Sequence, residues 1–110
     1  MTFASYERQH LSVYAAGFIS ADGSTKQGFG CTLTHVATGV YAVVFGADDG
    51  LVDGDSYTMV TPKGTSSTVS LSTVVEDTSN NVKTIFVNSG GDTPTDAGLE
   101  IAVFRTVTRG

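Results

Sequence analysis

Apolar and polar residues alternate along most of the chain with the period of two that is typical of half-buried β-strands. The pattern is clearest between residues 28 and 45. There, residues 31–36 alternate cleanly, Gly39 closes a short turn, and residues 40–45 follow as a run that is apolar on both faces. The stretch predicts a β-hairpin whose second strand is covered on both sides. The two faces of that second strand are a larger one (Tyr41, Val43 and Phe45) and a smaller one (Val40, Ala42 and Val44).

Five further segments have the composition and spacing of strands, with loops rich in Gly, Asp or Ser between them. Pro62 is expected to end the strand before it, because proline has no N–H to donate to a ladder. Residues 76–81 are interpreted as a polar turn, and residues 88–98 as a long loop. The seven or eight short strands predict an all-β domain, an antiparallel β-sandwich of jelly-roll-like or meander topology. The five segments are residues 11–19, 56–61, 68–75, 82–87 and 99–107.

The segment of residues 11–19 is apolar on both of its alternating faces, and such a strand must be covered on both sides. Residues 1–10 are polar apart from Phe3 and Tyr6. They are interpreted either as an arm that packs on a neighbouring subunit or as a frayed lead-in, with residues 11–110 forming the single domain. The pattern in residues 11–19 places Leu11, Val13, Ala15 and Ile19 on one side and Tyr14, Ala16 and Phe18 on the other.

Composition favours the interpretation that partners cover part of the surface. Only 15% of the 110 residues are charged, against about a quarter in ordinary domains, and the exposed positions fall to Ser, Thr and small apolar residues. The net charge is −5, with six Lys and Arg spread singly. This argues against nucleic-acid partners and against an anionic membrane surface. Cys31 is the only cysteine, so no internal disulfide is expected, and the N-terminus lacks the pattern of a signal peptide.

The chemistry-bearing residues do not form a catalytic or metal motif, and we expect neither an enzyme nor a cofactor. The acidic loop of residues 48–55 has the carboxylates that calcium prefers, but Met59 and Val60 stand where an EF-hand needs a glutamate. A solvated connection is the preferred interpretation. Residues 54–57 (GDSY) look like the nucleophile block of one esterase family, yet no histidine follows residue 35 to act as base.

Three further features have a structural interpretation that is preferred over a functional one. Cys31 and His35 share a strand face without a third orienting group, so the thiol is expected to be a small buried side chain and His35 a satisfied core or interface residue. The four tyrosines (Tyr6, Tyr14, Tyr41 and Tyr57) are compatible with a sugar-binding surface, but packed interfaces are the commoner place for tyrosine.

Several runs of the chain resemble small β-sandwich modules of tailed-bacteriophage virion proteins, namely capsid decoration (cement) proteins and tail-fibre tip domains. In those modules a pattern ADG–GxG–TGVYxVxF precedes a strand ending in VTP, and an aromatic-containing strand comes last. The likeness covers most of residues 14–107. The matching runs are residues 16–24 (AGFISADGS), 28–30 (GFG), 34–45 (THVATGVYAVVF), 57–62 (YTMVTP) and 101–104 (IAVF).

The resemblance implies a homotrimeric virion structural protein, made in the host cytoplasm, that carries no catalytic residues. Because no long shaft precedes the module, we expect a self-standing decoration protein that binds the major capsid protein and stabilises the shell. The alternative is a receptor-binding tip module of a tail fibre that recognises host glycans through the loops at residues 46–55 and 88–98. The expected trimer or capsid interface comprises Phe3, Tyr6, Tyr14, Phe18, Val40 and Val44.

Overall fold

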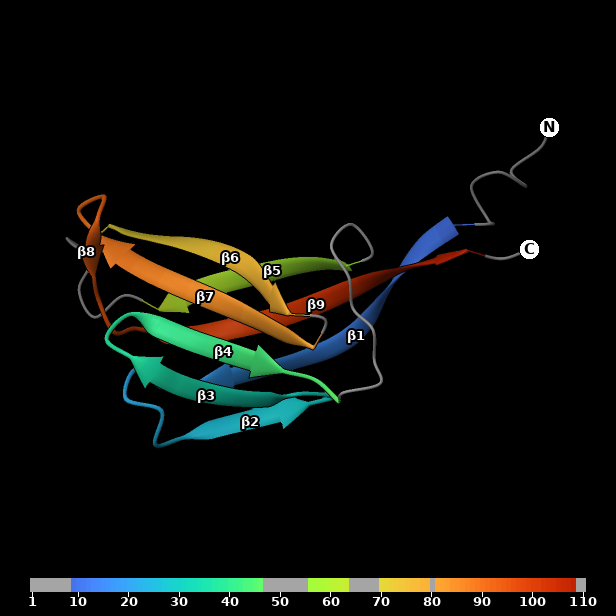
Figure 1. Ribbon diagram of the computed structural model, residues 1–110, viewed down its shortest axis with the longest axis horizontal. Coiled ribbons are helices and arrows are strands. Elements are labelled where there is room, and N and C mark those ends of the chain that lie inside the picture. Colours follow the sequence, from blue (N-terminus) through green and yellow to red (C-terminus); the bar gives the residue numbers. More distant parts are fainter. Residues whose placement is uncertain (1–8, 47–55, 64–69, 80, 109–110) are drawn as a thin grey trace.

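The computed structural model describes residues 9–46, 56–63, 70–79 and 81–108 of the protein. These residues form two antiparallel sheets that pack face to face (Figure 1), which confirms the predicted antiparallel β-sandwich. One sheet has the strand order β2-β1-β9-β5, and the other has the order β3-β4-β7-β6 with β8 paired to β7. The strands are β1 (Gln9–Ile19), β2 (Lys26–Phe29), β3 (Thr32–Ala37), β4 (Val40–Val44), β5 (Ser56–Lys63), β6 (Leu71–Ser79), β7 (Val82–Ser89), β8 (Thr93–Pro94) and β9 (Gly98–Thr108).

The first and last strands hold the four-stranded sheet together. β1 pairs with β9 from Gln9↔Thr108 to Ile19↔Leu99, and β9 also pairs with β5 on its other side. In the second sheet β4 pairs with β7. Because these pairs join strands far apart in the sequence, a simple meander does not describe the fold. The start of β1 and the end of β9 run together beyond the rest of the sandwich, on the right of Figure 1.

The core lies between the two sheets and is built from the apolar positions that alternate along β3, β4, β7 and β9. The predicted large face of β4 is buried, and so are the alternating residues Leu99, Ile101 and Val103 of β9. Fully burying one such side chain stabilises the fold by about 1.5–3 kcal/mol. The buried core residues are Ala15, Ile19, Leu33, Tyr41, Val43, Phe45, Ile85, Val87, Ala97, Leu99, Ile101 and Val103.

β1 departs from the predicted alternation at a β-bulge. The pattern places Val13 on the same side of the strand as Ala15, and this prediction is wrong: Val13 is 55% exposed on one face, whereas Ala15 is fully buried on the other. The register of β1 against β9 shifts between these two residues, and one extra residue in a strand reverses the faces on which its neighbours lie. Tyr14, at the bulge, packs against the core rather than pointing away from it.

Edge positions explain two further corrections. Pro62 does not end its strand, because β5 continues to Lys63. β5 pairs only with β9, and proline is tolerated on an edge strand where its missing N–H breaks no ladder. β6 likewise continues through part of the predicted polar turn to Ser79, with a register shift after Asp77.

Two short strands occupy segments to which the sequence assigns no strand. β2 pairs with the end of β1, and the two-residue β8 pairs with β7 inside the expected long loop. The described residues therefore contain nine strands, against the seven or eight predicted. None of the described residues belongs to a helix long and apolar enough to cross a membrane.

Candidate interaction surface

The outer face of the sheet β2-β1-β9-β5, which is turned away from the other sheet, carries large apolar side chains that are exposed to solvent. We call it the outer face. Seven large hydrophobic residues are exposed among the described residues, and the strand register places five of them here. No described segment packs over them, although monomeric proteins rarely leave large contiguous apolar patches uncovered. The five residues are Val13, Phe18, Phe29, Tyr57 and Met59.

Cross-strand pairing makes these side chains neighbours rather than isolated exposed residues. Residues directly opposite each other in adjacent strands have Cβ atoms about 5 Å apart and lie on one face. Three successive rows therefore cross the outer face from β5 to β1 or β2. The rows are Tyr57–Phe104–Val13, Met59–Ala102–Ala16–Phe29 and Thr61–Glu100–Phe18–Gln27.

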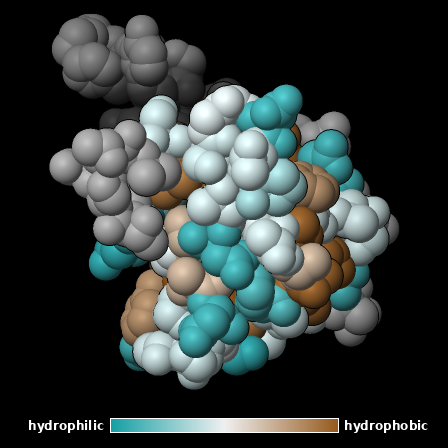
Figure 2. All heavy atoms as spheres, turned by 90° about the vertical axis from the view of Figure 1, so that its left-hand side faces the viewer, coloured by the Kyte–Doolittle hydropathy of each residue, from teal (hydrophilic) through white to brown (hydrophobic). Residues whose placement is uncertain are grey.

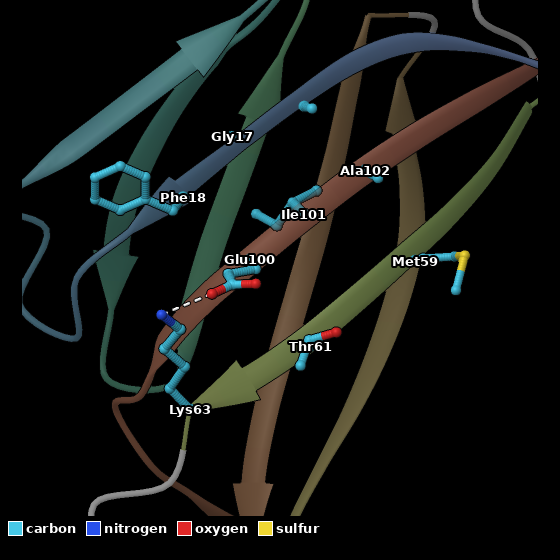
Figure 3. A pocket seen from close by; sticks show the side chains of 9 residues that line it. Gly17, Phe18, Met59, Thr61, Lys63, Glu100, Ile101 and Ala102 are labelled. Atoms are coloured by element: carbon cyan, nitrogen blue, oxygen red, sulfur yellow. Dashed lines mark ion pairs between the residues drawn. The ribbon is translucent and has the colours of Figure 1, made fainter.

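A groove of about 570 Å³ lies on the outer face. Figure 3 shows Phe18 on β1 and Met59 on β5 at its two sides, with Ala102 on β9 between them. The middle row is hollow because Ala16 and Ala102 are small, while their neighbours are large. The groove is thus an apolar depression between protruding apolar side chains.

One ion pair closes an end of this groove. Lys63 Nζ lies 2.6 Å from Glu100 Oε1 (Figure 3), and both side chains are more than half exposed. An ion pair at such an exposed position contributes only about 0–1 kcal/mol to stability. The pair matters more for the charge of the surface. Lys63 and Glu100 are the only charged side chains that the described strands place on the outer face, so this face has no net charge.

The expected interface residues are divided between different parts of the structure. Phe18 lies on the outer face. Tyr14 instead packs against the core, with its ring 5.7 Å from that of Phe45 and the Arg105 guanidinium 5.5 Å above it. Val40 and Val44 lie half-buried on the outer side of the other sheet. Phe3 and Tyr6 fall outside the described residues.

Sequence reasoning missed Phe29 and Met59 as surface residues, and it considered Tyr57 only as one of four tyrosines suited to a packed interface or a sugar-binding surface. A signal for Tyr57 and Met59 was present in β5, where these two large side chains stand at alternate positions. In an ordinary half-buried strand that set faces the core. Here it faces solvent, and Ser56 and Thr58 face inward, so the strand is oriented opposite to the usual rule.

A second notable group, at one end of the sandwich, is a polar network centred on Asp96. Its Oδ1 accepts a hydrogen bond from the Gly39 N–H at 2.7 Å and lies 2.9 Å from His35 Nε2. The His35 ring stacks on the Tyr41 ring at 4.8 Å. Figure 2 shows this end of the molecule, where hydrophobic atoms reach the surface among hydrophilic ones. The network connects the turn after β3 to the loop before β9. It does not resemble a nucleophile–base pair, because no hydroxyl or thiol in the described network is hydrogen-bonded to His35.

Acid is expected to weaken this network. The hydrogen bond from the Gly39 N–H, followed by the contact with His35, lowers the pKa of the Asp96 carboxyl below its usual range. A lowered carboxyl pKa stabilises the fold above the unfolded pKa, and that stability is lost as the pH falls through the folded pKa. We therefore expect the melting temperature to fall below about pH 4, and to fall less in the Asp96→Asn variant. Melting curves between pH 7 and pH 2 measure this.

The Asp96→Asn variant is still expected to lose stability in acid, because the pKa of Asp22 is lowered as well. Asp22 accepts hydrogen bonds from the Ser24 N–H and from the hydroxyls of Ser24 and Ser20. These bonds lower the pKa of Asp22 to about 2. Equal acid slopes for the wild type and the Asp96→Asn variant, with Asp22 intact in both, would contradict the role assigned to Asp96.

Cys31 is a half-buried thiol that precedes β3. Its Sγ lies 4.0 Å from the Ala16 carbonyl oxygen, and burial raises its pKa. His35 is held by Asp96 and not by this thiol. A raised pKa keeps the sulfur protonated at neutral pH, which makes it a poor nucleophile.

A small open pocket lies where β5, β6 and β7 meet. It measures about 260 Å³ and is lined in part by Ser56, Thr58, Asp77 and Lys83. The Lys83 side chain is 5% exposed and its Nζ lies 2.5 Å from Asp77 Oδ1. The hydroxyls of Ser56 and Thr58 are buried and form no hydrogen bond with another protein atom. Lys83 is already paired with Asp77. Among the described residues that line this pocket, it is therefore not available as a base to activate the Ser56 hydroxyl.

The acidic loop expected to be a weak calcium candidate lies outside the described residues. Within the described ranges, no group of three or more His, Cys, Asp or Glu side chains converges as metal ligands would. Comparisons with known proteins add no relative: no family model, no curated protein and no solved structure matches this chain.

Proposed function

We propose that this protein is a virion structural protein, a capsid decoration (cement) protein that binds the shell of a tailed bacteriophage as a homotrimer and stabilises it. The observation that supports this most directly is the outer face, a row-by-row array of exposed apolar side chains that no described segment covers. Such a surface is suited to protein contact. The resemblance of residues 14–107 to virion modules supplies the particle context.

Assembly as a trimer also explains how a small, weakly charged module holds to a particle. A single copy needs only a weak contact with the major capsid protein. When three copies are joined, each further contact forms at a high effective concentration, and the combined affinity exceeds that of one copy by a factor of about 10²–10⁴.

Sedimentation with undecorated capsids tests this function. The purified protein is expected to pellet with capsids up to a fixed number of copies and to raise the temperature at which the shells disrupt. Adsorption to host cells without binding to capsids would instead favour the receptor-binding tip of a tail fibre. Binding to neither would remove both virion assignments.

A further inference from the structure

We infer that the outer face is occupied by another copy of this same chain, so that the homotrimer forms through the sheet β2-β1-β9-β5 and the shell is bound elsewhere. This inference rests on the function proposed above and specifies the partner of its most exposed surface. Three properties of the face support a second copy as the occupant: its charge, its shape and its position.

Charge does not oppose contact between copies at this face. The chain carries a net charge of −5, which in general opposes the close approach of two copies. On the outer face Lys63 and Glu100 are the only described charges, and they cancel. Both are more than half exposed, and a neighbouring copy presents the same two charges. Each lysine then has a glutamate available in its own chain or in the next, which is the complementarity that fixes register at interfaces.

The shape of the face provides both a depression and a protrusion to fit it. The groove is floored by Ala16 and Ala102. Phe29 lies at the end of the same row on the edge strand β2 and is 69% exposed, the highest exposure among the large hydrophobic residues described. Around a threefold axis the contacts are heterologous, meaning that one patch of each copy meets a different patch of the next. Phe29 of one copy entering the groove of the next repeats three times and closes the ring.

The position of the face leaves the core independent of this contact. Met59 and Ala102 point away from the buried residues of β9, Ile101 and Val103, which fill the inter-sheet core. Side chains on the outer face are therefore free to be changed without disturbing the interior. That separation makes the inference testable by single substitutions.

The test compares molar mass by light scattering for the wild type and three variants at the same micromolar concentration. Met59→Glu places a charge beside the groove, and Ala102→Phe fills the groove without adding charge. Val74→Glu is the matched control, since Val74 is also an exposed apolar residue on an edge strand, but of the other sheet. We expect a roughly tenfold or greater rise in the dissociation constant for the first two variants, and none for Val74→Glu. Circular dichroism checks that each variant is folded.

The outcomes separate this inference from the function on which it rests. If Met59→Glu and Ala102→Phe remain trimeric, or if Val74→Glu dissociates while they do not, the outer face is not the contact between copies. If the wild type is monomeric and Met59→Glu loses capsid binding, the face binds the shell, which overturns the inference and leaves decoration standing. If the wild type neither associates nor binds capsids, the proposed function fails as well.

Discussion

Replacing Gly39 by alanine is expected to lower the free energy of unfolding by roughly 3 kcal/mol or more. Gly39 has a φ of +69°, a conformation that costs other residues about 1–2 kcal/mol. A Cβ at this position would also lie 2.7 Å from both the Thr95 nitrogen and the Val87 oxygen. These are backbone atoms of the neighbouring strand and loop, so no side chain can turn aside to relieve the clash. Thermal or denaturant unfolding at a fixed protein concentration measures the loss.

Gly90 provides the matched control for this prediction. It also has a positive φ, of +60°, but nothing lies within 4 Å of the position of its Cβ. Gly90→Ala is therefore expected to show the conformational cost alone, about 1 kcal/mol. The free energy of unfolding that Gly39→Ala loses beyond the loss in Gly90→Ala measures the steric clash between the turn and β7. Equal losses in the two variants would show that the turn moves away freely, which would contradict the tight packing at this end.

Removing the hydroxyl of Tyr41 is expected to cost about 2–4 kcal/mol. This hydroxyl donates a hydrogen bond to the Ala21 carbonyl at 2.6 Å and accepts one from the Ala97 N–H at 3.1 Å. Burial raises its pKa, so it remains a donor at neutral pH. Tyr41→Phe leaves a backbone donor and a backbone acceptor without this partner, while the ring still fills the core. The loss is measured by the same unfolding experiment.

Tyr57→Phe is the control for the Tyr41 prediction. In the single chain Tyr57 is more than half exposed and water replaces any partner of its hydroxyl, so a change within about 0.5 kcal/mol is expected when unfolding is measured at a concentration too low for copies to associate. Similar losses for the two tyrosines would show that the Tyr41 hydroxyl does not hold the loops around Ala21 and Ala97 together.

The sequence predicts the interior well, because burial leaves a periodic signal in each strand. The inward set of β4 and that of β9 are buried as the alternation indicates. The bulge in β1 has no such signal, since an inserted residue changes the faces without changing the composition. The continuation of β5 through Pro62 depends on the strand lying at an edge, and that position is set by pairing with β9, nearly forty residues further along the chain.

The candidate surface was only partly predictable, for a related reason. An apolar set on one face of a strand predicts burial, but not whether the chain itself or a partner supplies the cover. For β5 the sequence predicts a strand without assigning its faces, and the structure exposes both Tyr57 and Met59. The network around Asp96 was missed because its partner His35 lies 61 residues away, beyond the reach of any local motif.

The central claim is that other copies of this chain cover the outer face. Native mass spectrometry of the wild-type protein at micromolar concentration tests it most directly, with dilution to follow dissociation. The account predicts a species of three chains, each of 11.4 kDa. A single chain at all concentrations would contradict it.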